Sequence, residues 1–287
     1  MEPRAKRIDV SNRLAGLSPH SQFGRAARIA VNHPLTMFFT LAYVCSWLVF
    51  LPMILLRAPI ELTILASFGP TLAALITHRL ANGNYSAFRL YTKLSRTLIA
   101  TASGTLLIIL AYVVLPGVAT ADPHKLNWSI LTSVTVYNYS TLLGGPLGEE
   151  PGWRGYALPR LEAHVGPLWA SVLLALLWAG WHLPLFLIPG WTSSPKWIYV
   201  LILIGLCVIM TFGANMARFN VIPAIVMHAA FNTVSKFLAG LFTAVQPSTS
   251  IPFELVLALC GLGVAFMLVL GTKGRLAYEP VTYWHDA

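Results

Sequence analysis

The sequence has 287 residues, of which 56% are hydrophobic and only 10% are charged, and its mean hydropathy is +0.69. Soluble globular domains carry about 25% charged residues, because charge covers their whole surface. This composition excludes a soluble globular enzyme and indicates a polytopic α-helical membrane protein. The net charge of +9 is explained by basic cytoplasmic loops, so no nucleic-acid partner is expected.

A basic N-terminal tail, 1–32, precedes the first apolar segment. It is either a helix lying on anionic lipid or a segment without fixed structure, and we favour the second interpretation. A cleavable signal peptide is not expected, because the basic residues of the tail are spread along it rather than followed at once by an apolar run. We expect the first membrane span to act as the targeting signal.

Eight segments meet or approach the length of about 20 helical residues that a bilayer core of about 30 Å requires. They are 35–56, 59–78, 97–118, 128–147, 167–188, 197–217, 221–242 and 252–271. The fourth is the most polar. We therefore predict an all-α fold of eight transmembrane helices around a polar intramembrane cavity. The membrane domain covers 33–272, with its functional core at about 128–242, and a C-terminal tail covers 273–287.

Basic residues favour alternate loops, as the positive-inside rule requires. Besides the N-terminal tail, the loops expected inside hold Arg79, Arg89, Lys93, Arg96, Arg154, Arg160, Arg218, Lys273 and Arg275. The loops expected outside hold only Arg57, Lys125 and Lys196. Both termini are therefore predicted to be cytoplasmic, and a prokaryotic plasma membrane is the expected location.

Two adjacent carboxylates, Glu149 and Glu150, follow the fourth apolar segment. Arg154 lies four residues after Glu150, so these two can pair on one helix face. Glu149 then points about 100° away and is free to act as an acid or base. Pro151 suits the first turn of such a helix, where the macrodipole favours carboxylates. The alternative is a charged loop between two spans.

His182 lies deep in the fifth apolar segment. A lone buried histidine can simply be a hydrogen-bonded core residue. However, Val165 and Gly166 mark the turn before this segment, and Glu149 and His182 lie at almost equal distances from it in sequence. An antiparallel helical hairpin would bring these two side chains to the same level.

His228 and Asn232 are four residues apart and therefore share one face of the seventh segment. Alternatively, each makes only an interhelical hydrogen bond. Measured from the midpoints of their spans, His182 and His228 differ in depth by about 10 Å at 1.5 Å per residue. Tilt or a protruding hairpin is needed to bring the two imidazoles together.

These motifs resemble those of the CPBP family of intramembrane proteases, also called the Abi family. It contains type II CAAX prenyl endopeptidases, lysostaphin-resistance-like proteins, and bacteriocin-processing or self-immunity proteins. Its first motif, two Glu, three residues and Arg, matches Glu149, Glu150 and Arg154, and the frequent Gly after the Arg is present as Gly155.

The other two family motifs follow in order. An aromatic residue before a His matches Trp178 and His182, with Trp where Phe is more usual, and His followed four residues later by Asn matches His228 and Asn232. The resemblance covers about 141–237 and implies an eight-span intramembrane endopeptidase. The partners it implies are the lipid bilayer and a membrane protein or lipidated, CAAX-like peptide as substrate; the oligomeric state is not indicated.

Peptide hydrolysis requires an activated water and donors for the oxyanion. We expect Glu149, assisted by His182, to polarise the water, His228 and Asn232 to stabilise the oxyanion, and Glu150 and Arg154 to support the site. The resemblance implies that prenyl-protein members need no metal.

Two alternatives to this mechanism remain. One is a zinc enzyme in which His182, His228 and a carboxylate bind the metal, although no His-Glu-x-x-His sequence is present. The other is a membrane immunity, scaffold or transport protein without proteolytic activity. Single substitutions at Glu149, His182 and His228 distinguish a protease from such a protein.

Overall fold

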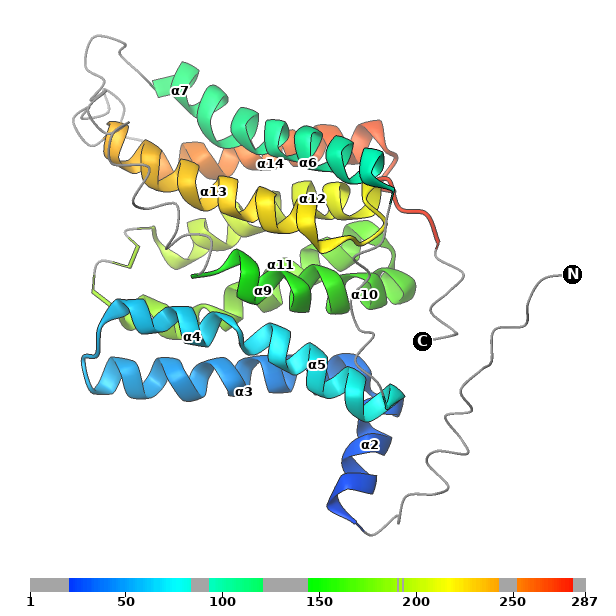
Figure 1. Ribbon diagram of the computed structural model, residues 1–287. Helices are drawn as coiled ribbons and strands as arrows, with labels where there is room; N and C mark the ends of the chain where they lie inside the picture. Colours follow the sequence, from blue (N-terminus) through cyan, green and yellow to red (C-terminus); the bar gives the residue numbers. More distant parts are fainter. Residues whose placement is uncertain are drawn as a thin grey trace, which may run out of the picture.

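The computed structural model describes residues 21–83, 93–120, 144–189, 191–192, 194–242 and 252–280. These residues form helices joined by turns, and no strand occurs among them. Most of the helices run side by side along one axis, as Figure 1 shows. The predicted all-α fold is therefore confirmed.

The first half of the described chain contributes helices to two opposite sides of the bundle, as Figure 1 shows. These are α2 (Gln22–Asn32), α3 (Pro34–Leu55), α4 (Thr63–Ser67), α5 (Gly69–Asn82), α6 (Leu94–Ile109) and α7 (Leu115–Thr120). A 3-10 turn, Ile60–Leu62, precedes α4, and a π-helical turn, Leu110–Val114, joins α6 to α7.

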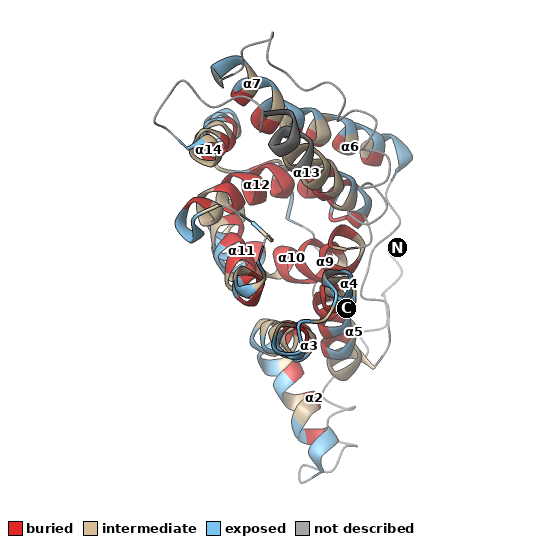
Figure 2. Cartoon of the chain, turned by 90° about the vertical axis from the view of Figure 1, so that its left-hand side faces the viewer, coloured by how far each residue is buried: buried red, intermediate tan, exposed pale blue. Residues whose placement is uncertain are grey.

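The second half contains the helices that carry the motifs. They are α9 (Pro146–Gly152), α10 (Leu158–Val165), α11 (Pro167–Trp181), α12 (Lys196–Met216), α13 (Val221–Phe242) and α14 (Phe253–Gly271). Figure 2, which views the bundle along its helices, shows α9, α10 and α12 coloured mainly as buried. α9, α10 and α12 thus lie in the interior, with α5, α11 and α13 packed around them.

Six helical stretches of the described chain are long and apolar enough to cross a membrane. They are Pro34–Leu55, Thr63–Asn82, Leu94–Ala119, Pro167–Leu187, Lys196–Met216 and Phe253–Gly271. Each overlaps a predicted span, which supports an integral membrane protein. The predicted count of eight is not confirmed. The fourth segment lies outside the described residues up to position 143, and the apolar stretch identified in α13, Val221–Ser235, is shorter than the others.

The helix that carries the paired glutamates begins earlier than predicted. Pro146, not Pro151, lies at its first turn, and Pro151 is inside α9. A π-helical turn, Trp153–Ala157, follows Pro151 and leads into α10. Proline removes a backbone donor within a helix, and a π-helical turn changes the hydrogen-bond register locally. The paired glutamates are therefore in a buried helix rather than in a loop between spans.

Small residues let α9 come close to the start of α5. A Cβ atom on Gly148 would lie 2.7 Å from the carbonyl group of Ser67, and one on Gly152 would lie 2.5 Å from that of Pro70. Such distances are too short for a real side chain, so α9 depends on these glycines for its place. Thr71 adds a hydrogen bond of 2.6 Å to the carbonyl oxygen of Gly148.

Part of the N-terminal tail is helical, so the favoured prediction that it lacks fixed structure is wrong for 22–32. The side chain of Ser21 caps α2 by accepting a hydrogen bond of 3.0 Å from the backbone N–H of Gly24. Small buried residues of α2 pack on α5, and α2 runs across the direction of α3 (Figure 1). Its contact with lipid stays a prediction, and residues 1–20 lie outside the described chain.

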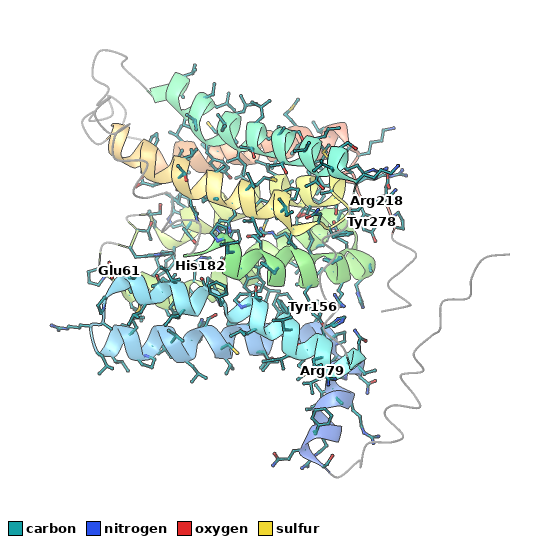
Figure 3. The ribbon with its side chains drawn as sticks, in the orientation of Figure 1. Glu61, Arg79, Tyr156, His182, Arg218 and Tyr278 are labelled. Carbon is teal, nitrogen blue, oxygen red and sulfur yellow. The ribbon has the colours of Figure 1, made fainter. Side chains whose placement is uncertain are left out.

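Two of the basic residues predicted to lie inside are found at one end of the bundle. Figure 3 shows Arg79 and Arg218 near one end, and Glu61 at the other. Arg218 donates a hydrogen bond of 2.6 Å to Glu279, which holds the pKa of that carboxyl below its usual value. The cytoplasmic location of this end stays a prediction. Arg154 was also predicted to lie in an inner loop, but it is buried inside the bundle.

Candidate active site

The hairpin predicted between the first and second motifs is confirmed. The backbone turns at Gly166, whose φ of +77° is readily adopted by glycine, and α10 and α11 then pack against each other. Glu149, in the first turn of α9, thereby lies beside Trp178 of α11. The indole Nε1–H of Trp178 donates a hydrogen bond of 2.7 Å to Oε2 of Glu149. Both side chains are buried.

The predicted pair of Glu150 and Arg154 is also confirmed. Nη1 of Arg154 donates a hydrogen bond of 3.0 Å to Oε1 of Glu150, and both side chains are almost completely buried. Nη2 of Arg154 donates to Sγ of Cys207 on α12 at 3.0 Å. The guanidinium lies 4.4 Å from the centre of the Trp178 ring. Arg154 thus links the carboxylate pair to α11 and α12.

His228 shares the carboxylate of Glu150 with Arg154. Its Nδ1 lies 2.7 Å from Oε1 of Glu150. A carboxylate accepts hydrogen bonds, so Nδ1 of His228 is the donor and Nε2 is left for another partner. This contact joins α9 to α13 and was not predicted.

His182 is held in the same sense, also through Nδ1. Its Nδ1 lies 2.8 Å from the carbonyl oxygen of Trp178, so Nδ1 carries a proton and Nε2 of the neutral ring is an acceptor. Aromatic rings surround the imidazole, with centroid distances between 4.7 and 5.8 Å, and belong to Trp178, Trp181, Trp191 and Tyr199. As Figure 3 shows, His182 lies between the two ends of the bundle.

Both imidazoles contact the same indole ring, so the depth difference estimated from the sequence does not keep them apart. The ring centre of Trp178 is 5.6 Å from that of His182 and 5.1 Å from that of His228. Regular helix ends at Trp181, and a 3-10 turn, Leu183–Leu187, replaces the rest of the predicted span. The span midpoints used for the estimate were therefore misplaced.

Asn232 meets the site beside Gly145. A Cβ atom on Gly145 would lie 3.2 Å from Oε1 of Glu149, 3.4 Å from Nδ2 of Asn232 and 3.6 Å from Cε1 of His228. A carboxylate, an amide and an imidazole from α9 and α13 therefore converge on one point. Together with the contacts of Trp178, this brings all six predicted site residues into one cluster. Their catalytic roles stay predictions.

Several contacts of the site could not be read from the sequence. Trp178 was predicted only as the aromatic residue of the second motif, whereas its N–H donates a hydrogen bond to Glu149. Gly145 and Cys207 carried no chemical signal, because a glycine before a helix and a cysteine in an apolar run are common. Trp191 and Tyr199 lie beyond the recognisable motifs, and only the folding of the chain brings them to His182.

The zinc alternative requires several ligands around one point. In the parts of the chain that the structure describes, no group of three or more His, Cys, Asp or Glu side chains could hold a metal ion. One nitrogen of each imidazole and one oxygen of Glu149 bond to protein groups, which leaves Nε2 of His182, Nε2 of His228 and Oε1 of Glu149 for other partners. Histidines that bind zinc commonly donate their other N–H to a protein group, so the zinc alternative stays a prediction to be tested.

Comparison with known proteins agrees with the motifs. Residues 127–234 match the family described as type II CAAX prenyl endopeptidase Rce1-like. The family resemblance is confirmed. The matched segment contains every candidate residue of the site, from Glu149 on α9 to Asn232 on α13.

A curated relative is similar over part of the chain. CAAX prenyl protease 2 of Methanococcus maripaludis is 29% identical over 99 residues, which are 32% of this chain and 36% of the relative. The chain thus matches little more than a third of the length of that relative. The similarity supports the family, and the activity of the whole protein is a matter for the proposal that follows.

Proposed function

We propose that the protein is an intramembrane endopeptidase, and that it cleaves a membrane-associated or prenylated, CAAX-like protein or peptide with a water activated by Glu149. The observation that supports this most is the convergence of Glu149, His228 and Asn232 on the point beside Gly145. Buried ionisable groups in a membrane bundle are costly, so such a cluster favours a chemical role over a purely structural one. The similarity to a protein named CAAX prenyl protease supports the substrate class.

Glu149 is the base in this proposal. Its Oε1 takes a proton from the water, while the hydroxide oxygen bonds to the carbonyl carbon of the substrate. When the C–N bond breaks, the same proton passes to the leaving nitrogen, so the step balances without another reactant. His182 assists through Nε2, which can accept a hydrogen bond because Nδ1 carries the proton.

His228 and Asn232 act on the oxyanion. Nδ1 of His228 donates to Glu150, so Nε2 can donate to the oxyanion only when the imidazole is doubly protonated. The amide of Asn232 contributes a neutral donor. Glu150 and Arg154 therefore support catalysis by holding His228 and Trp178 rather than by touching the substrate.

The test uses the full chain reconstituted in lipid vesicles with a farnesylated peptide that ends in a CAAX sequence. We expect the wild type to release the terminal fragment and Glu149→Gln to lower kcat by about 10²- to 10⁴-fold, the usual contribution of a general base. Glu61→Gln is the matched control, because Glu61 is an exposed glutamate in a turn far from the site. Equal activity of the two variants would overturn the proposal.

Two further arms of the same assay separate the alternatives. We propose a metal-independent reaction, so activity should survive exhaustive treatment with a chelator; loss that zinc restores would support the metalloenzyme. The unprenylated peptide tests the substrate class, and equal cleavage of both peptides would contradict a requirement for the prenyl group. A wild type that cleaves no membrane-associated peptide would favour an immunity, scaffold or transport protein.

A further inference from the structure

The carboxylate of Glu149 is held in one orientation. Its Oε2 accepts the hydrogen bond from Trp178, and Trp178 is itself confined between the guanidinium of Arg154 over its face and the ring of His228 at 5.1 Å. Trp178 is almost fully buried, so its indole has little room to turn. The other oxygen, Oε1, is consequently directed toward Gly145.

Two polar atoms of complementary kind face the space beside Gly145. Oε1 of Glu149 and Nδ2 of Asn232 lie 3.2 Å and 3.4 Å from the position that a Cβ atom on Gly145 would take. That position is within bonding distance of the Cα atom, so a ligand atom has to lie beyond it, between the two polar groups. The amide donates and the carboxylate accepts, so a molecule that does both is matched to the pair. Water is the smallest such molecule.

We propose that the space beside Gly145 holds the attacking water, and that Trp178 is the positioning residue that turns Oε1 of Glu149 toward it. This inference rests on the proposed peptidase function and adds the location of the reacting atom. The water donates one hydrogen to Oε1 of Glu149 and accepts one from Nδ2 of Asn232. Since an amide has two N–H donors, Asn232 can hold the water and still reach the oxyanion.

The first variant, Gly145→Ala, places a methyl group against the position where the water is proposed to lie. Its Cβ would meet neighbours at 3.2–3.6 Å, which requires shifts of only a few tenths of an ångström. We expect kcat to fall by about 10- to 100-fold, because a small displacement at a reacting centre can cost about 100-fold, with little change in KM. Gly263→Ala is the matched control, since its Cβ meets nothing within 4 Å.

The second variant, Trp178→Phe, keeps an aromatic ring but removes the N–H that holds Glu149. We expect kcat to fall by about 10- to 100-fold for the same reason, while KM stays within about threefold. Trp153→Phe is the matched control. Trp153 is equally buried, and its Nε1 has no hydrogen-bond partner among the described residues. A merely structural role for Trp178 would change both Trp variants alike.

Thermal unfolding of each variant in the same lipid accompanies the kinetics. The proposal holds if both site variants lose kcat while they unfold near the wild-type temperature. Wild-type kcat in Gly145→Ala overturns the water position, and equal kcat of Trp178→Phe and Trp153→Phe overturns the positioning role. If Gly145→Ala does not fold, Trp178→Phe decides alone. If Glu149→Gln keeps wild-type activity, the proposed function is wrong. If Glu149→Gln loses activity while Gly145→Ala and Trp178→Phe keep it, only this inference is wrong.

Discussion

Glu149 and Glu150 are neighbours in the chain but have different surroundings. Glu150 faces two cationic or potentially cationic partners, Arg154 at 3.0 Å and His228 at 2.7 Å. Glu149 accepts a hydrogen bond from the neutral indole of Trp178 and presents its other oxygen to the space beside Gly145. These surroundings fit the proposed role of Glu149 as the base and of Glu150 as a supporting residue.

This difference predicts that Glu150→Gln lowers the stability of the protein far more than Glu149→Gln does. Glu150→Gln leaves the charge of Arg154 buried without its counter-ion, and breaking a buried ion pair costs about 3–5 kcal/mol of folding free energy. Glu149→Gln removes no ion pair, so we expect a much smaller change. Thermal unfolding of both variants in lipid measures this, and equal unfolding temperatures would contradict the assigned roles.

At the residue scale, the sequence predicted the contacts that depend on local helix geometry. The spacing of four between Glu150 and Arg154 was enough to pair them. The bond between His228 and Glu150 joins side chains 78 positions apart, so only tertiary packing determines it. Arg154 was also counted as an inner-loop residue, although its predicted pairing with Glu150 allows its burial.

At the scale of elements, close packing of helices depends on individual glycines. α12 and α14 meet at Gly205, where an added Cβ would lie 2.8 Å from the backbone carbon of Gly261. Backbone atoms cannot move aside as a flexible side chain can. Small residues at such contacts are typical of helices that pack inside membranes.

We expect Gly205→Ala to lower the stability of the protein by about 1–3 kcal/mol, the usual cost of overpacking. The midpoint of thermal unfolding in detergent measures the change. Gly263→Ala, on the same pair of helices, has open space for its Cβ and should unfold like the wild type. A stable Gly205→Ala protein would show that α12 and α14 do not pack this closely.

Hydrophobic length predicted the long helices well, because six apolar stretches each form a helix near the expected position. It failed where backbone geometry changes within a segment. The 3-10 turn after Trp181 and the π-helical turn after Gly152 leave the apolar composition unchanged. A helix in the tail was considered but not favoured, because the arginines and other polar residues of α2 keep its average composition from being apolar.

At the scale of the whole molecule, the end that carries Arg79 and Arg218 is predicted to face the cytoplasm (Figure 3). Glu61 lies at the opposite end, and Arg275 follows α14 as an exposed residue. Single cysteines introduced as Glu61→Cys and Arg275→Cys can be labelled in intact cells with a membrane-impermeant thiol reagent. We expect labelling of the first from outside and of the second only after lysis. Labelling of both from one side would contradict this topology.

The account depends on residues of α9 and α13 acting as one unit on a single water. The most direct measurement is a double-mutant cycle for kcat/KM of peptide cleavage with Glu149→Gln, Asn232→Ala and the double variant. Residues that act as a unit have non-additive effects, so we predict that the double variant is hardly slower than Glu149→Gln alone. Effects that multiply would show two independent residues, and this result would contradict the shared site beside Gly145.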